Sequence, residues 1–324
     1  MHRLARALRY AFLPEPRKLH VSSSHKLGAR PTAELKIPVP YGHLAAKEWL
    51  PRPNEDPNRR LLCLHGHQDN AGSFDALLAE LDPRWHAVAL DLTGHGLSTH
   101  LPRGCIYTFF HFTCDVIRAL RFLGWERFCL MGHSLGALIA HHHANLFGDQ
   151  VRKLVLLDAF GHQFERSSTV LERTRGLTLE SLRLDDKDTG SQSSYTVDEI
   201  VQLYAKAGFQ YFPRDVEVLM QRGGRRTGNG RFFFTRDART KASLWTRVDR
   251  AEIEDYMKGY TNDMFVLHAL PGLGYSVTCQ RLVADICRKN CKSFEMACVE
   301  GNHHVHMNRP DLVAAHVGPF LEKP

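Results

Sequence analysis

Short apolar runs alternate with amphipathic stretches along most of this 324-residue chain. Six nearly continuous apolar runs lie at Leu61–Leu64, His86–Leu90, Phe128–Met131, Leu154–Leu157, Met264–Leu267 and Phe294–Val299. Apolar residues at helical spacing separate or follow these runs near residues 73–81, 109–123, 134–147, 276–289 and 310–321. Strands that are apolar on both faces need helices on both sides, which is the arrangement of a parallel sheet. The pattern therefore predicts an α/β protein.

Two further strands are predicted near the start of the chain. Glu34–Val39 and His43–Trp49 flank Pro40-Tyr41-Gly42, and two strand-like runs joined by such a turn indicate a hairpin. We therefore expect a mostly parallel eight-stranded sheet with helices on both faces.

One polar interval interrupts the alternation. It lies between the fourth and fifth apolar runs and contains helical patches near residues 164–175 and 197–222. Compact domains do not use connecting loops of about a hundred residues, so the interval predicts an inserted helical cap over the carboxyl edge of the sheet. We assign residues 33–160 and 256–322 to the core and residues 161–255 to the cap.

The sequence indicates no cofactor and no metal. The Gly- and Arg-rich run Arg222–Gly230 predicts a solvated turn, because no strand-to-helix junction frames it as a phosphate site requires. No Gly-x-Gly-x-x-Gly follows an early strand, so a dinucleotide is not expected. The eight Cys form no Cys-x-x-Cys pair, and His141–His143 cannot share one helix face. We expect reduced thiols without a catalytic role.

The net charge of +7 is concentrated in the first thirty residues. Residues 1–30 hold seven basic side chains and one acidic side chain, which leaves the rest of the chain with a net charge of +1. A nearly neutral body has no field that would gather a polyphosphate, so nucleic acid is not an expected partner. No apolar run reaches the ~18 residues of a membrane-spanning helix, so no transmembrane segment is expected either.

The basic tail, residues 1–30, is typical of a targeting segment. Leu4, Leu8 and Phe12 would share one face of a helix, with arginines mostly off that face and serines following. This profile predicts a mitochondrial transit peptide; the alternative is a disordered basic arm without an address, in a protein of the cytoplasm or the peroxisome. The C-terminal Leu321–Pro324 is not a peroxisomal tripeptide.

The central chemical feature is Gly132-His133-Ser134-Leu135-Gly136, which lies between a predicted strand and a predicted helix. A Gly-x-Ser-x-Gly sequence in that context indicates a nucleophile elbow. The chain must reverse sharply there, which strains the serine backbone, and larger groups at 132 and 136 would clash where strand and helix converge. The N-terminus of the helix also favours negative charge on a reacting oxygen. Ser134 is therefore the candidate nucleophile.

A nucleophilic serine needs an oxyanion hole and a base. His65-Gly66-His67 directly follows the first apolar run and can present a backbone N–H beside the elbow. We expect the N–H groups of His67 and Leu135 to be the two oxyanion donors. The base should follow the last strand, where Gly301–His306 contains three histidines.

Together these motifs resemble the α/β-hydrolase fold. The chain is most similar to the serine hydrolase-like proteins, over about residues 33–322, through LCLHGHQDNAGSFD, GHGLS, GHSLG, LLDAF and EGNHHVHMNRP. In that family the catalytic histidine begins a His-x-x-x-x-x-x-Pro pattern, which runs here from His303 to Pro310. The resemblance therefore implies His303 as the base and places His304 and His306 in the wall of the site or behind it.

The triad acid is open to more than one interpretation. Relatives usually carry it after the seventh strand, yet the segment His268–Ser276 contains no carboxylate. Some α/β-hydrolases, including certain haloalkane dehalogenases, instead carry it after the sixth strand, where Asp158 lies in this chain. The resemblance thus implies Asp158 as the acid. The alternatives are that Asp158 only anchors a loop, or that the chain has no working triad acid.

The serine itself narrows the chemistry. The resemblance implies a comparison with epoxide hydrolases and haloalkane dehalogenases, which carry Asp at the position of Ser134 and form an alkyl ester. Serine does not readily perform that displacement. We expect a cofactor-free serine hydrolase that forms an acyl-enzyme on a small-molecule ester, thioester or related carbonyl substrate, through Ser134, His303 and Asp158. The alternative is a catalytically weak protein of the same fold that binds a small ligand or a partner. The sequence indicates neither the substrate-binding residues nor the oligomeric state.

Overall fold

The structure is a computed structural model that describes residues 20–21, 30–52, 54–161, 167–186, 193–242, 252–273 and 277–324. The basic tail lies outside these residues apart from a two-residue strand and Arg30, so the mitochondrial transit peptide stays a prediction. Every helix within the described ranges is too short or too polar to span a bilayer.

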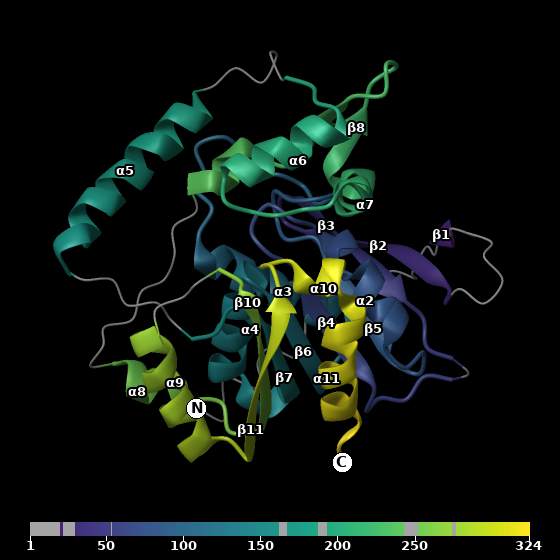
Figure 1. The fold of residues 1–324 in the computed structure, drawn as a ribbon, viewed down its shortest axis with the longest axis vertical. Coiled ribbons are helices and arrows are strands. Elements are labelled where there is room, and N and C mark those ends of the chain that lie inside the picture. Colours follow the sequence, from purple (N-terminus) through teal and green to yellow (C-terminus); the bar gives the residue numbers. More distant parts are fainter. Residues whose placement is uncertain are drawn as a thin grey trace.

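Nine strands of the described chain form one sheet, in the order β1-β2-β3-β5-β4-β6-β7-β10-β11 (Figure 1). Their bounds are β1 His20–Val21, β2 Thr32–Val39, β3 Gly42–Trp49, β4 Arg60–Leu64, β5 His86–Leu90, β6 Phe128–His133, β7 Val151–Leu157, β10 Asp263–Pro271 and β11 Ser293–Gly301. Neighbours from β5 to β11 are all parallel, while β2 and β3 form an antiparallel hairpin on the β5 side. The eight predicted strands are present, and β1 adds a short ninth.

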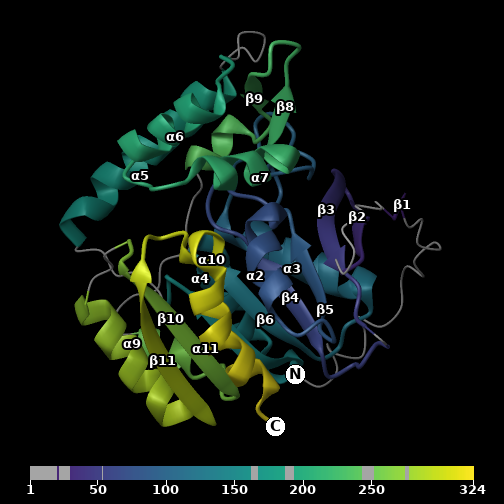
Figure 2. The same ribbon diagram turned by 45° about the vertical axis from the view of Figure 1, so that its right-hand side comes forward.

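Alternate residues of the central strands enter two separate cores. In β4, Leu62 and Leu64 pack with α3 and α4, whereas Leu61 and Cys63 pack with α2 and α11. The helices that flank the sheet are α2 Asp75–Glu80, α3 Phe109–Leu123, α4 Leu135–Leu146, α8 Ile253–Met257, α9 Val277–Asn290, α10 Val305–Asn308 and α11 Pro310–Glu322, with 3₁₀ turns at Ala71–Phe74 and Gly148–Gln150. Figure 2 shows α2 and α11 in front of the strands. Burial on both faces explains why these strands are apolar without alternation.

Helix α3 shows how local chemistry sets the ends of an element. The Thr108 side chain accepts the N–H of His111 at the first turn, and Gly124 with φ 66° ends the helix in the left-handed conformation. Between these caps, Phe112 and Val116 are fully buried one helical turn apart. The predicted helix 109–123 has the bounds that the structure shows.

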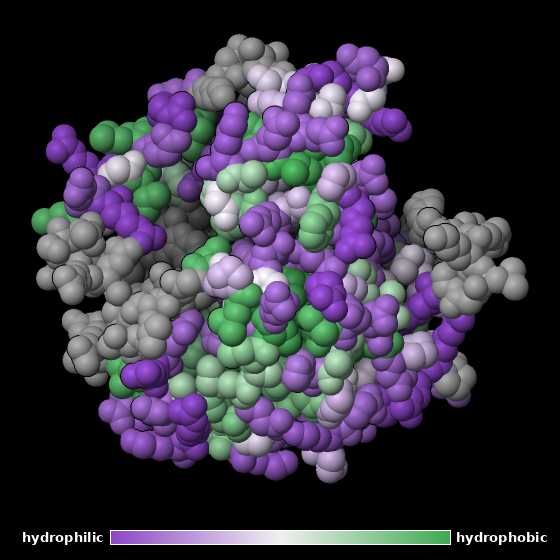
Figure 3. Space-filling view, viewed as in Figure 1, coloured by the Kyte–Doolittle hydropathy of each residue, from purple (hydrophilic) through white to green (hydrophobic). Residues whose placement is uncertain are grey.

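The segment assigned to the cap lies over the carboxyl edge of the sheet (Figure 1). It contains α5 Ser167–Asp185, α6 Val197–Lys206, α7 Pro213–Gly223, the hairpin β8 Gly224–Arg226 with β9 Phe232–Phe234, and a 3₁₀ turn at Ala238–Ala242. Hydrophilic side chains cover most of the outer surface of α6 and α7 in the space-filling view (Figure 3). The boundaries that divide core from cap stay a prediction.

The helical patch predicted near residues 197–222 contains two helices, α6 and α7. Gly208 takes φ +85° just beyond α6, a left-handed conformation that ends a helix. Pro213 then begins α7, where its missing N–H costs no helical hydrogen bond. The segment between these two residues carries the side chains of Phe209 and Tyr211 to the pocket described below.

The solvated turn predicted at Arg222–Gly230 is correct only in part. Residues 227–230 form an exposed or half-exposed hairpin turn, but Arg222 is buried. Its guanidinium pairs with Asp91 Oδ2 at 2.8 Å and with the carboxylate of Glu34. A buried guanidinium is tolerated only with such partners, so Arg222 fastens α7 to the core.

Several histidines are buried with their rings uncharged, and His143 in α4 is the plainest case. Neither of its ring nitrogens has a hydrogen-bond partner among the described residues. Burial, together with the neighbouring His142, lowers the pKa of His143 from 6.5 to about 4. Burial also lowers the pKa values of His65 and His95. The folded protein therefore resists protonation that the unfolded chain accepts.

We predict that the free energy of unfolding falls as pH drops below about 6.5. Each histidine that is protonated in the unfolded chain and neutral in the folded one removes about 1.4 kcal/mol per pH unit between its two pKa values. Urea unfolding between pH 7.5 and pH 5 measures this slope. His143→Phe removes one such group and should reduce the slope; a stability that is constant over this range would contradict the prediction.

Candidate active site

The backbone at Ser134 is a sharp left-handed turn between β6 and α4. Ser134 has φ 51° and ψ −118°, and its N–H donates to the carbonyl oxygen of Leu157 at 3.1 Å. A Cβ on Gly136 would lie 2.0 Å from the carbonyl oxygen of Leu64, and one on Gly132 would lie 2.3 Å from that of Gly136. The two glycines therefore allow the helix to meet the sheet closely enough to present the serine.

Asp158 and His303 meet although 145 residues separate them. His303 Nδ1 lies 2.6 Å from Asp158 Oδ2, and both residues are buried. The backbone N–H groups of Ala269 and Leu273 donate to the same carboxylate, at 2.9 and 3.2 Å. The end of β10 and the loop after it, which hold no acid of their own in the sequence, thus supply N–H donors that orient an acid directly after β7.

The environment of His303 keeps its ring neutral at pH 7. Burial lowers the pKa of His303 from 6.5 to about 4, although its hydrogen bond with Asp158 acts in the opposite direction. A neutral ring whose Nδ1–H donates a hydrogen bond to Asp158 has its lone pair on Nε2. His303 can therefore accept a proton from a group in the pocket that it lines.

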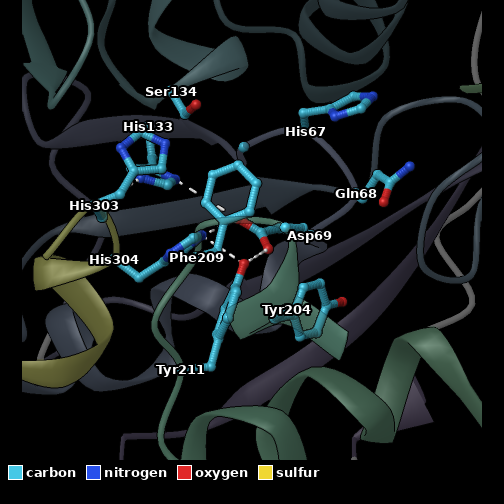
Figure 4. A pocket seen from close by; sticks show the side chains of 12 residues that line it. His67, Gln68, Asp69, His133, Ser134, Tyr204, Phe209, Tyr211, His303 and His304 are labelled. Carbon is cyan, nitrogen blue, oxygen red and sulfur yellow. Dashed lines mark hydrogen bonds and ion pairs between the residues drawn. The ribbon is translucent and has the colours of Figure 1, made fainter. Parts of the chain in front are cut away.

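Ser134 and His303 line the same small pocket, whose cavity volume is about 70 Å³ (Figure 4). The pocket is lined by Gly66, His67, Gln68, Asp69, His133, Ser134, Tyr204, Ala207, Phe209, Tyr211, His303 and His304. Within the described chain the Ser134 hydroxyl makes no hydrogen bond, and it is not sealed in the interior. Catalytic hydrogen bonds are often long without substrate and tighten when it binds.

The two proposed oxyanion donors come from the loop after β4 and from the residue after the serine. Leu135 is the first residue of α4, directly after Ser134, and His67 lines the pocket. In the described part of the chain neither backbone N–H donates to a loop or side-chain acceptor. The His67 ring is used elsewhere, because its Nε2 lies 3.0 Å from the carbonyl oxygen of Thr240.

A second polar network lies beside the serine, and sequence reasoning missed most of it. Tyr211 donates its O–H to Asp69 Oδ1 at 2.7 Å, and its oxygen lies 2.5 Å from His304 Nε2. His133 Nε2 donates to the carbonyl oxygen of His303 at 2.8 Å. Figure 4 shows these side chains converging from the core and the cap. In this network burial raises the pKa of Asp69, but the interactions with His304 and His133 outweigh burial. The pKa of Asp69 is therefore well below its usual range.

The sequence contains no local signal for this network, since Asp69 and Tyr211 are 142 residues apart. His304 lines the pocket as predicted, whereas His306 is behind it, with its ring centroid 4.1 Å from that of His133. The described residues contain one cluster whose geometry could hold a metal ion, and it consists of Asp69, His133 and His304.

Comparisons with known proteins agree with this fold. Residues 61–316 match the model of the "Alpha/beta hydrolase family". A "Serine hydrolase-like protein" of Danio rerio is 31% identical over 90% of this chain and 89% of its own, and a "Probable serine hydrolase" of Drosophila melanogaster is 32% identical over 92% and 90%. The crystal structure of a hypothetical protein from Pseudomonas aeruginosa superposes with a TM-score of 0.75, at 26% identity over 90% of this chain and 99% of that one. The fold and the resemblance expected from the sequence are confirmed.

We predict that Gly136→Ala destabilises the protein by at least about 3 kcal/mol, because the new methyl group overlaps backbone atoms that cannot move aside. Gly176→Ala in α5 is the matched control: no heavy atom lies within 4 Å of its Cβ position, so we expect a gain of about 0.5–1 kcal/mol. Chemical unfolding of both variants measures the difference. Equal stabilities would contradict the close packing at the elbow.

Proposed function

This chain belongs to the alpha/beta hydrolase family, and from that membership we propose that it is a serine hydrolase that forms an acyl-enzyme on Ser134. The family and its relatives support a hydrolytic role in general. The observation that supports the more specific proposal is the 2.6 Å contact between His303 and Asp158 beside the pocket that Ser134 lines.

The proposed reaction is an acyl transfer in two halves. The Ser134 oxygen attacks a carbonyl carbon while His303 Nε2 takes the hydroxyl proton, and Asp158 holds the ring and stabilises the imidazolium. The N–H groups of His67 and Leu135 stabilise the negative charge that develops on the carbonyl oxygen. His303 then gives the proton to the leaving group, and a water molecule, activated by the same ring, releases the acid and restores Ser134.

The position of Ser134 supports this role energetically. It precedes the first residue of α4, where the partial positive charge of the helix N-terminus stabilises an anion nearby. The substrate is an ester, a thioester or a related carbonyl compound, because these compounds can transfer an acyl group to a serine oxygen. The cap residues Tyr204, Phe209 and Tyr211 form the outer wall of the pocket and select the acyl group.

A second candidate function is a catalytically weak protein that binds a small ligand in this pocket. The observation that favours it is that the Ser134 hydroxyl makes no hydrogen bond to the His303 ring within the described chain, although both residues line the pocket. The two functions differ in whether His303 takes the hydroxyl proton of Ser134, since only the enzyme requires that transfer.

We predict that a fluorophosphonate probe labels the protein at neutral pH and that Ser134→Ala abolishes the labelling. The probe reports a serine oxygen whose proton can be removed by a neighbouring base. Ser194→Ala in the cap is the control, and it should be labelled like the unchanged protein. A folded protein that does not react with the probe would favour the ligand-binding function.

We predict that Asp158→Asn lowers kcat on an activated ester such as p-nitrophenyl acetate by about 10⁴-fold, because the amide leaves the His303 ring in the wrong tautomer. The melting temperature should change little, since the side-chain oxygen of Asn still accepts the N–H of Ala269. Asp75→Asn, which breaks an ion pair with Lys47 away from the pocket, is the control and should keep its kcat. If Asp158→Asn keeps full turnover, the carboxylate is only a loop anchor.

A further inference from the structure

Two buried acceptor atoms face each other beside the serine pocket. His133 Nδ1 and Asp69 Oδ2 lie 3.7 Å apart, and neither has a hydrogen-bond partner among the described residues. Gly66 keeps the space next to them open, because a Cβ at that residue would lie 2.8 Å from both atoms. Buried polar atoms are rarely left without partners, so this pair needs an explanation.

The tautomer of His133 makes the pair more unusual. Its Nε2 contacts the carbonyl oxygen of His303, and a carbonyl can only accept, so Nε2 carries the proton. With its single proton on Nε2, a ring in this tautomer presents a lone pair at Nδ1 toward the lone pairs of the Asp69 carboxylate. Two lone pairs at this distance repel each other, and a cation placed between them would satisfy both.

His304 offers a third lone pair at the same place. Its Nε2 lies 3.4 Å from Asp69 Oδ2, and its Nδ1 is buried without a hydrogen-bond partner in the described chain. The ring can therefore carry its proton on Nδ1 and present Nε2 as a ligand, at the expense of its hydrogen bond with Tyr211. The ligating atoms of the three residues all lie within 4.8 Å of one another.

We propose that Asp69, His133 and His304 form an inhibitory binding site for a divalent transition-metal ion, Zn²⁺ in particular. Two imidazole nitrogens and one carboxylate oxygen are a typical Zn²⁺ ligand set. Ligands about 2.0–2.1 Å from a tetrahedral ion lie about 3.3 Å apart, close to the 3.4 and 3.7 Å separations here. The remaining separation, between His133 and His304, is at most 4.8 Å, so the two imidazoles must move closer together to close the site.

The position of the site implies inhibition. All three residues line the pocket with Ser134, so an ion that they hold would take up part of the small space open to a substrate. The ion would also hold the ring of His133, whose other nitrogen is bonded to the backbone of His303. The binding part of the proposal stands without the hydrolase activity, whereas the inhibitory part rests on the proposed function.

The binding test is a Zn²⁺ titration of the metal-stripped full chain at pH 7.5 in competition with a chromogenic chelator. We expect one site that Asp69→Asn and His304→Gln each weaken by about tenfold or more. His306→Gln is the matched control, since this buried histidine lies against His133 and is outside the ligand set. Replacing Zn²⁺ by Co²⁺ should give a tetrahedral spectrum without sulfur charge-transfer bands.

Equal Zn²⁺ affinities in the unchanged protein and all three variants would overturn the proposed site. A proton or a water molecule between His133 and Asp69 would then explain the pair. Circular dichroism checks that each variant folds, and Asp69→Asn, which has the shape of the native side chain, decides the test if His304→Gln does not fold.

The inhibition test measures fluorophosphonate labelling of Ser134 with and without Zn²⁺. We expect Zn²⁺ to suppress labelling of the unchanged protein, a chelator to restore it, and His304→Gln to resist the suppression. Labelling that continues with the site filled would overturn the inhibitory role. A protein that binds Zn²⁺ at these residues and is never labelled would keep the metal site and reject the hydrolase proposal instead.

Discussion

The candidate site depends on one steric constraint, the close approach of the first turn of α4 to the ends of β4 and β6. With Gly136 against the carbonyl oxygen of Leu64, no side chain beyond hydrogen fits, and the backbone at Ser134 must take its left-handed turn. This turn holds the serine at the carboxyl edge of the sheet and directs its N–H to Leu157 on the neighbouring strand. Strain at one residue is maintained by the packing of many others.

Parallel strand order brings the remaining groups to the same edge. The sheet runs β6-β7-β10-β11, so the residues that follow these strands are neighbours in space although they are far apart in the sequence. Asp158 follows β7, its carboxylate is held by N–H groups at the end of β10 and beyond, and His303 follows β11. The parallel strand order therefore lets an acid that follows β7 meet a histidine that follows β11.

Burial has opposite effects on function and on stability. A buried imidazole stays neutral and can accept a proton, which the proposed mechanism requires of His303. The same burial at His143 makes the folded protein sensitive to acid. Beside the serine, Asp69, His133 and His304 each have a buried polar atom without a hydrogen-bond partner in the described chain, which is the basis of the proposed cation site.

The sequence by itself determined the main elements of this protein and its candidate nucleophile. Apolar runs buried on both faces, the caps of α3 and the glycines around Ser134 act over a few residues, so they can be recognised locally. The split between α6 and α7 was missed because the long apolar pattern outweighed one glycine and one proline. Only the tertiary structure decided that Asp158 lies next to His303, that Arg222 is buried, and that Asp69 and Tyr211 meet. These contacts join segments far apart in the chain, and their formation depends on strand order and on the docking of α7, which no local pattern encodes.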